Sequence, residues 1–172
     1  MENSLNVNNT GIKLSYYDTF FKIWEFSTNL SAYKTKTSPT SLELEKSSAN
    51  SFYYSFDNSI ALNQSKTVFI MLNFWHRLPF IYANVYLKDM LEFSPGIKAS
   101  LFNKQLQISA VLSDAFRTLK NNGHADYSNL RRNFTQYNDY RNFTFSLTYN
   151  FGNEKVKSKS PKINFEEKDR TN

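Results

Sequence analysis

The chain has 172 residues, of which 40% are hydrophobic and 17% aromatic, and its formal net charge is +6. This content excludes a disordered chain, and its 16 Phe and 11 Tyr favour strands over helices. Because cysteine is absent, a disulfide framework and a thiolate metal site are also excluded.

The charged and apolar residues exclude two further classes of protein. Lys and Arg are scattered, and the densest basic stretch lies in a polar tail without an aromatic platform, so we predict no nucleic-acid partner. The longest uninterrupted apolar run, residues 68–72, is far shorter than the roughly 18 residues of a membrane helix. No signal peptide follows Met1, where the sequence is polar.

Alternating apolar and polar residues predict seven strands. The fourth is the weakest, because Phe69, Met71 and Trp75 make its second face apolar as well. In chain order the predicted strands span residues 12–20, 24–32, 52–62, 67–78, 91–101, 105–116 and 143–152. The fold class predicted from them is all-β and antiparallel.

The last strand shows the alternation most clearly, with Thr144, Ser146, Thr148 and Asn150 on its polar face. If the strands cross a membrane, their apolar faces contact lipid. The residues predicted to face lipid are Phe143, Phe145, Leu147, Tyr149, Phe151, Leu106, Ile108, Leu112, Phe93 and Ile97.

The connections alternate in length, as they do at the two ends of a barrel. Short turns are predicted near residues 21–23, 63–66 and 102–104, and longer loops at 37–49, 79–86 and 118–139. We expect the short turns to be periplasmic and the longer loops extracellular. Residues 1–152 then form barrel strands, and the polar tail 153–172 is predicted to be disordered and periplasmic.

Three features favour a membrane barrel over a soluble β-protein. The segments reach about 10 residues, as a bilayer-crossing strand requires. Aromatic residues gather beside the short turns, and the polar faces carry mostly Ser, Thr, Asn and Gln, which suit a wet lumen. A soluble β-sandwich or small β-barrel binding module remains the alternative. Seven is an odd number of strands, so we expect an incomplete barrel.

The order of these segments resembles the C-terminal region of outer-membrane β-barrel proteins related to TonB-dependent receptors. The resemblance rests on YLKDMLEFSPGIKASLFNKQLQISAVLSDAFRT (86–118) and YRNFTFSLTYNFG (140–152), and on the hairpin-like segments 11–33 and 51–62. Pro95 departs from the pattern, because it lies inside a strand that should be paired on both sides. A bulge or local break is therefore expected there.

The resemblance implies a barrel of about 22 strands with a plugged lumen in the cell outer membrane. Such receptors take up a scarce nutrient ligand with energy relayed from the inner membrane. The implied partners are outer-membrane lipid, the barrel strands and plug that this chain lacks, and an energy-relaying inner-membrane protein that acts through the missing N-terminal region. No cofactor is implied.

Few residues suggest chemistry, and we expect no enzyme activity. His76 ends an apolar strand, where interfacial packing is the simpler explanation. Ser109 and Ser113 fall on the presumed lumen face, and no orienting acid is indicated for a hydrolytic site. His124 and Asp126 are too few for a metal site. The loop 118–139 offers possible extracellular ligand contacts, although its aromatic residues equally suit packing between loops: Tyr127, Arg131, Arg132 and Tyr137.

Overall fold

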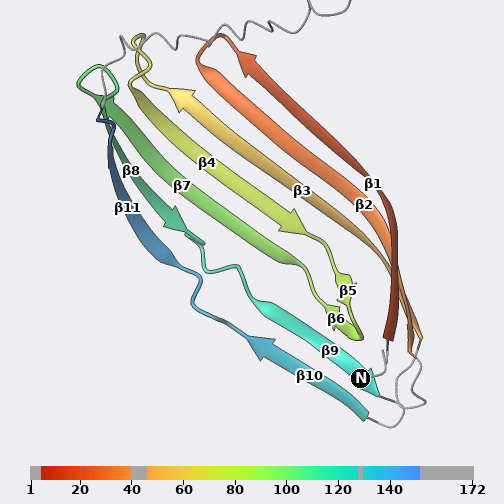
Figure 1. Cartoon of the computed structure of the whole chain (residues 1–172). Coiled ribbons are helices and arrows are strands. Elements are labelled where there is room, and N and C mark those ends of the chain that lie inside the picture. The colour runs from red at the N-terminus through yellow and green to blue at the C-terminus, as the bar shows by residue number, and fades with distance from the viewer. Residues whose placement is uncertain (1–4, 40–45, 128–129, 152–172) are drawn as a thin grey trace, which may run out of the picture.

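Figure 1 shows a computed structural model of the chain, which describes residues 5–39, 46–127 and 130–151. These residues form eleven strands, all paired antiparallel, and no helix. Within the same residues, no helical segment could therefore cross a membrane. The predicted tail, residues 153–172, lies outside the described part of the chain.

Seven long strands form the main sheet, in the order β1-β2-β3-β4-β7-β8-β11. Their bounds are β1 (Leu5–Phe20), β2 (Trp24–Pro39), β3 (Ser47–Ala61), β4 (Val68–Arg77), β7 (Met90–Leu101), β8 (Leu106–Ser113) and β11 (Asn142–Tyr149). These are the seven predicted strands. The first three are longer than predicted, because they continue through polar segments that show no alternation, whereas the last two end earlier.

Four shorter strands form a second sheet, in the order β10-β9-β6-β5. Their bounds are β5 (Phe80–Tyr82), β6 (Val85–Leu87), β9 (Asn121–Tyr127) and β10 (Leu130–Gln136). The longer connections predicted at 79–86 and 118–139 are therefore present, and most of their residues form the β5–β6 and β9–β10 hairpins. These hairpins extend the main strands at one end (Figure 1).

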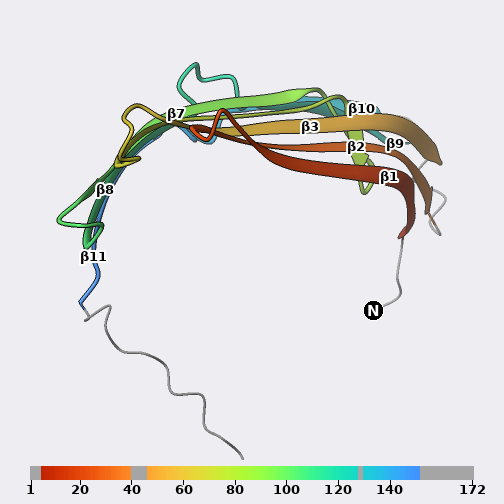
Figure 2. The same ribbon diagram turned by 90° about the horizontal axis from the view of Figure 1, so that it is seen from above.

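The main sheet is a single layer bent into an arch, as Figure 2 shows. Six antiparallel pairings separate its edge strands, so β1 and β11 run in the same direction. Within the described residues these two edges are not paired with each other, and the barrel is open. The structure is an antiparallel β-barrel segment that is not closed, as the odd strand count predicted.

Short turns join the strands at one end of the sheet (Figure 1). They occupy residues 21–23, 62–67 and 102–105, close to the predicted positions. In the first turn Phe21 and Lys22 have positive φ, and the amide of Ile23 donates to the carbonyl of Phe20 at 3.1 Å. Turns with positive φ match the twist of antiparallel strands, which explains how so few residues reverse the chain.

Pro95 interrupts the sheet on one side only. It pairs with Leu72 of β4, so the β4–β7 ladder continues through it. The β7–β8 ladder, in contrast, starts at Gly96, which pairs with Val111. Because proline has no N–H to donate, pairing with β8 ends beside it. The expected local break therefore lies between β7 and β8.

Candidate functional site

The register places the apolar faces of all seven main strands on one surface, which we call the apolar face. Leu147 pairs with Ile108, which pairs in turn with Ala99 of β7. Directly paired residues share a face of an antiparallel sheet, so each ladder extends the same surface. Of the residues predicted to face lipid, nine lie on it: Phe93, Ile97, Leu106, Ile108, Leu112, Phe143, Phe145, Leu147 and Tyr149. Phe151 follows the end of β11 and is exposed.

Exposure on the two faces is the reverse of that in a soluble protein. On the apolar face Ile12 is 79% exposed and Phe143 67%, whereas Ser55 and Ser94 on the opposite face are 6% and 8% exposed. Soluble proteins rarely leave so large a continuous apolar surface uncovered. The apolar face therefore requires an apolar surrounding.

The apolar face is long enough to cross a bilayer. In β1 its apolar residues begin at Ile12 and end at Phe20, nine residues that span about 26 Å along the strand. A transmembrane strand, which is tilted, needs about 9–11 residues to cross the apolar band of a membrane barrel. The outer parts of β1 and β2, residues 6–10 and 34–38, are polar apart from Val7 and extend beyond this band.

Aromatic rings cover much of the apolar face. Phe56 stacks on Phe26 of β2 and on Phe74 of β4, with centroid distances of 6.1 and 6.3 Å. Phe20 and Trp24, which flank the first short turn, lie 5.2 Å apart. Aromatic residues beside the turns, such as Phe20 and Trp24, form the interfacial girdle of a membrane barrel.

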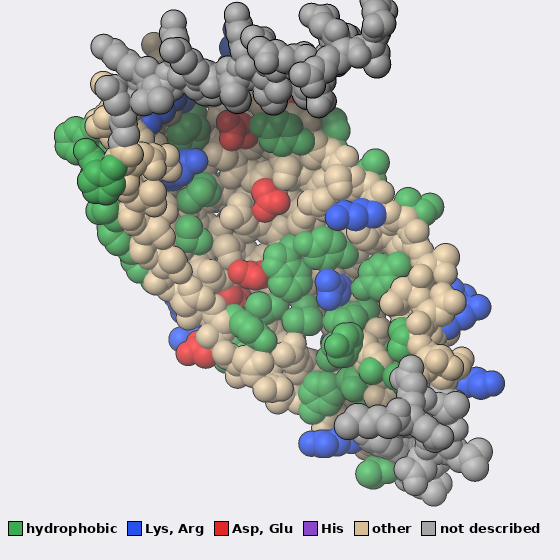
Figure 3. Space-filling model, in the orientation of Figure 1, with side chains coloured by type: hydrophobic (Ala, Val, Ile, Leu, Met, Phe, Trp, Pro, Cys, Tyr) green, Lys and Arg blue, Asp and Glu red, His purple; other side chains and the backbone are tan. Residues whose placement is uncertain are grey.

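The opposite face, which we call the polar face, is hollowed. A cavity of about 430 Å³ lies over β3, β4 and β7 and contains Asp57 and Glu92. Glu92 accepts hydrogen bonds from Trp75 Nε1 at 2.9 Å and Ser94 Oγ at 2.6 Å. Figure 3 looks onto a face on which acidic side chains lie along the middle. The polar face therefore offers an acidic, hydrogen-bonding wall to whatever the arch encloses.

The residues weighed for hydrolytic chemistry lie on opposite sides of the sheet. His76 pairs with Tyr54 on the apolar face, where its Nδ1 lies 3.0 Å from the Tyr54 hydroxyl and its Nε2 3.4 Å from Asp89. Ser109 and Ser113 belong to the polar face, opposite Ser146 and Asn142. His76 and the two serines therefore lie on opposite faces of the sheet and form no Ser–His pair.

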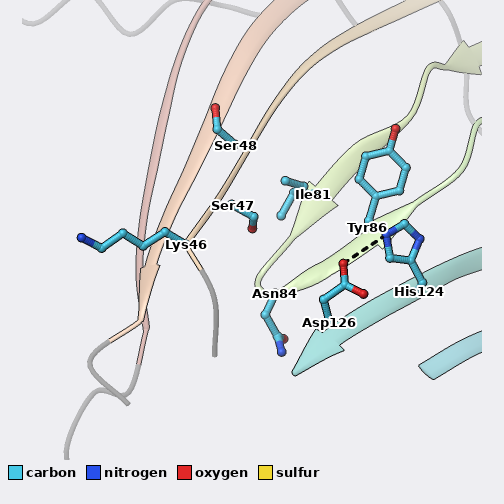
Figure 4. A pocket seen from close by; sticks show the side chains of 8 residues that line it. All are labelled: Lys46, Ser47, Ser48, Ile81, Asn84, Tyr86, His124 and Asp126. Carbon is cyan, nitrogen blue, oxygen red and sulfur yellow. Dashed lines mark ion pairs between the residues drawn. The ribbon is translucent and has the colours of Figure 1, made fainter. Parts of the chain in front are cut away.

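A smaller cavity of about 150 Å³ lies between the start of β3 and the second sheet. Figure 4 shows its lining, which includes Lys46, Tyr86, His124 and Asp126. The Tyr86 and His124 rings stack at 5.0 Å, and His124 Nε2 lies 3.6 Å from Asp126. Within the described residues, no group of three or more metal-binding side chains forms.

Arg131 holds the Asp126 carboxylate with two hydrogen bonds, of 2.7 and 3.1 Å. These bonds favour the ionised carboxylate, so they lower the pKa of Asp126 below its usual value, and the charges of Arg131 and His124 act in the same direction. The Asp126–Arg131 pair joins β9 to β10 and so stabilises the β9–β10 hairpin.

The four residues predicted as extracellular ligand contacts do not form one site. Arg131 is engaged by Asp126, and Arg132, its neighbour in β10, belongs to the other face of the hairpin. Tyr137 lies beyond β10, with its hydroxyl 3.4 Å from Asp139. The side chain of Tyr127 lies outside the described residues. Sequence reasoning missed Lys46 and Tyr86, which come together only through strand pairing.

The geometry agrees with the comparisons to known proteins. A family model described as "Outer membrane protein beta-barrel family" matches residues 1–149. The matched segment includes every described strand of both sheets. No curated protein and no solved structure matches the chain.

Proposed function

The chain belongs to the outer membrane protein β-barrel family, and from that premise we propose that it is part of an uptake receptor for a nutrient ligand, related to TonB-dependent receptors. Its location is the cell outer membrane. The observation that carries the proposal is the in-register apolar face across seven strands, opposed by a hollowed polar face. The soluble sandwich alternative needs two sheets packed face to face, and the main sheet is a single layer (Figure 2).

In this proposal each surface has its own partner. Outer-membrane lipid covers the apolar face, and further barrel strands pair with the free edges of β1 and β11. A plug domain faces the acidic cavity of the polar face, and an energy-relaying inner-membrane protein acts through a region outside this chain. The role is not catalytic and requires no cofactor or nucleic acid.

We further propose that the short turns are periplasmic and that the second sheet is extracellular. The longer, more polar connections of outer-membrane barrels lie on the cell surface. With this orientation β11 runs inward, so residues 153–172 follow it on the periplasmic side. On the extracellular side, the apolar face then ends where the polar parts of β1 and β2, residues 6–10 and 34–38, begin.

Single cysteines test this orientation, because the chain has none of its own. Asn138→Cys, beyond β10, should react with a membrane-impermeant maleimide on intact cells. Asn103→Cys, in the turn between β7 and β8, should react only after the outer membrane is permeabilised. The reverse pattern would overturn the orientation, and reaction of both on intact cells would overturn the spanning sheet.

Uptake itself is tested in cells that carry the full-length gene. Accumulation of labelled nutrients from a defined panel is compared in the parent strain, in a strain lacking this gene, and in one lacking the energy-relaying protein. We expect both deletions to abolish uptake of the same nutrient. Uptake that needs the gene but not the energy-relaying protein would show a passive channel and overturn the relation to TonB-dependent receptors.

A further inference from the structure

Arg77, the last residue of β4, lies on the polar face between two aromatic rings. Its guanidinium carbon lies 4.9 Å from the ring centre of Phe80 and 5.5 Å from that of Tyr53. Tyr53 belongs to β3 and is paired with Arg77, while Phe80 begins β5 and is buried. The two rings therefore fix the position of the cation at the border between the two sheets.

No carboxylate neutralises this cation among the described residues. Arg77 Nε is buried and has no hydrogen-bond partner in the described part of the chain. Of the two acidic residues of the neighbouring cavity, Glu92 accepts hydrogen bonds from Trp75 and Ser94, and Asp57 accepts one from Ser27. A buried polar atom without a partner is costly, so a group that supplies an acceptor here gains binding energy.

Arg77 opens onto a third cavity, of about 330 Å³, on the polar face. Its lining contains no Asp or Glu among the described residues, and its hydrogen-bonding side chains include Asn9, Tyr33, Tyr53 and Tyr82. In Figure 3 basic and hydrophobic side chains lie together in the lower half of the face shown. The cavity thus combines one positive charge with an aromatic wall.

Hydrogen-bonding groups complete the cavity. Within the described residues the hydroxyls of Tyr33, Tyr53 and Tyr82 make no hydrogen bond to another protein group. Thr35 Oγ1 donates to Asn9 Oδ1 at 2.6 Å, which leaves the Asn9 amide nitrogen to donate elsewhere. Hydroxyl and amide groups without internal partners can bind the several hydroxyls of a polyol or sugar.

From this arrangement we propose that the Arg77 cavity binds a sugar acid, a hydroxylated ring that carries a carboxylate. The guanidinium takes the carboxylate through two parallel hydrogen bonds, a geometry that arginine favours. The tyrosine rings cover the apolar faces of the sugar, and the tyrosine and asparagine groups bind its hydroxyls. This inference names the ligand class of the proposed receptor and rests on that function.

The test measures binding to the full-length protein purified in detergent, by isothermal titration calorimetry. The probes are the trimer of galacturonic acid, its methyl ester and inorganic phosphate. We expect the free acid to bind at least about tenfold more tightly than the ester, because the ester keeps the rings and hydroxyls but removes the charge. Binding that does not distinguish acid from ester, or no binding of the acid, overturns the proposal.

Variants locate the binding site. Arg77→Gln should weaken binding of the acid at least about tenfold, whereas Arg132→Gln, which removes an exposed arginine of β10, should leave the affinity unchanged. Tyr33→Phe, which removes only a hydroxyl, should weaken binding severalfold. If Arg77→Gln fails to fold, Arg77→Lys and Tyr33→Phe decide the question. Wild-type affinity in both overturns the proposal.

Two outcomes separate this inference from the proposed function. If phosphate binds as tightly as the trimer, the cavity is a simple anion site and the sugar-acid assignment fails. Binding in detergent needs no energy relay, so loss of binding leaves the uptake experiment unaffected, and loss of energised uptake leaves the binding result intact.

Discussion

The apolar and polar faces of the main sheet share one backbone but suit different surroundings. On the apolar face, large side chains such as Ile12 and Phe145 are mostly exposed, at 79% and 61%. On the polar face, small groups such as Ser55 and Ser94 are buried beneath larger neighbours. The comparison shows that side-chain polarity here follows the medium on each side and not depth within the protein, as expected for a sheet between lipid and an enclosed lumen.

The largest test of this difference places the same charge on either face of β11. Leu147→Arg should lower the free energy of unfolding by about 2–4 kcal/mol, because a charge near the bilayer midplane is poorly solvated. Ser146→Arg, one residue earlier and on the polar face, should cost much less. The measurement is urea unfolding of the full-length protein in lipid vesicles. Equal losses would contradict the assignment of the two faces.

Packing on the polar face can be tested at Gly96. A Cβ there would lie 2.9 Å from the carbonyl oxygen of Ala110 and 3.0 Å from both Met71 and Val111. Gly96→Val should therefore destabilise the protein by about 1–3 kcal/mol in the same assay. The control is Ala99→Val on the apolar face, where added methyl groups meet lipid and the expected change is within about 0.5 kcal/mol. A neutral Gly96→Val would show that the polar face is loosely packed.

Substitutions in the stacked rings of Phe26, Phe56 and Phe74 test whether contacts between strands stabilise the apolar face. A double-mutant cycle with Phe56→Leu and Phe74→Leu should give a coupling of about 0.5–1.5 kcal/mol, because the two rings stack. A matched cycle with Phe26→Leu and Phe74→Leu should be additive, since β3 separates their strands. Equal coupling in both cycles would mean that lipid, and not direct ring contact, transmits the effect.

The smallest effect on stability is expected outside the main sheet, in the β9–β10 hairpin. The hydrogen bonds from Arg131 lower the pKa of Asp126, so the pair stabilises β9–β10 above the usual carboxyl pKa. This stabilisation is lost as the pH falls through the lowered pKa of the folded state. Carboxyl NMR titration should show Asp126 titrating below 3.8, and Arg131→Gln should move its midpoint upward. An unchanged midpoint would contradict the pairing.

Alternation in the sequence was enough to predict the seven main strands, their faces and the short turns. Each strand from Ile12 onward contains a stretch in which every second residue is apolar, and lipid on one side demands that pattern. The same information predicted the break at Pro95. It also predicted that Ser109 and Ser113 lie on the polar face, where the register has them, but it assigned His76 to neither face.

Neither the second sheet nor the Arg77 cavity could be predicted from the sequence. The strands β9 and β10 have polar residues on both faces, as in LRRNFTQ, so no period of two reveals them. The cavity requires Tyr53, Arg77 and Phe80 from three strands, and only the pairing of β3 with β4 brings them together. The one clue was the charge of Arg77 at the end of an otherwise apolar strand.

The shared direction of β1 and β11 restricts what can complete the barrel. Two copies of this sheet, inserted with the same orientation in one membrane, would meet edge to edge as parallel neighbours. Antiparallel pairing at both edges instead requires an odd number of intervening strands. Copies of this sheet are thus poorly suited to close a ring with one another, because their edge strands would be parallel. The barrel is better completed by an odd number of strands from a different segment.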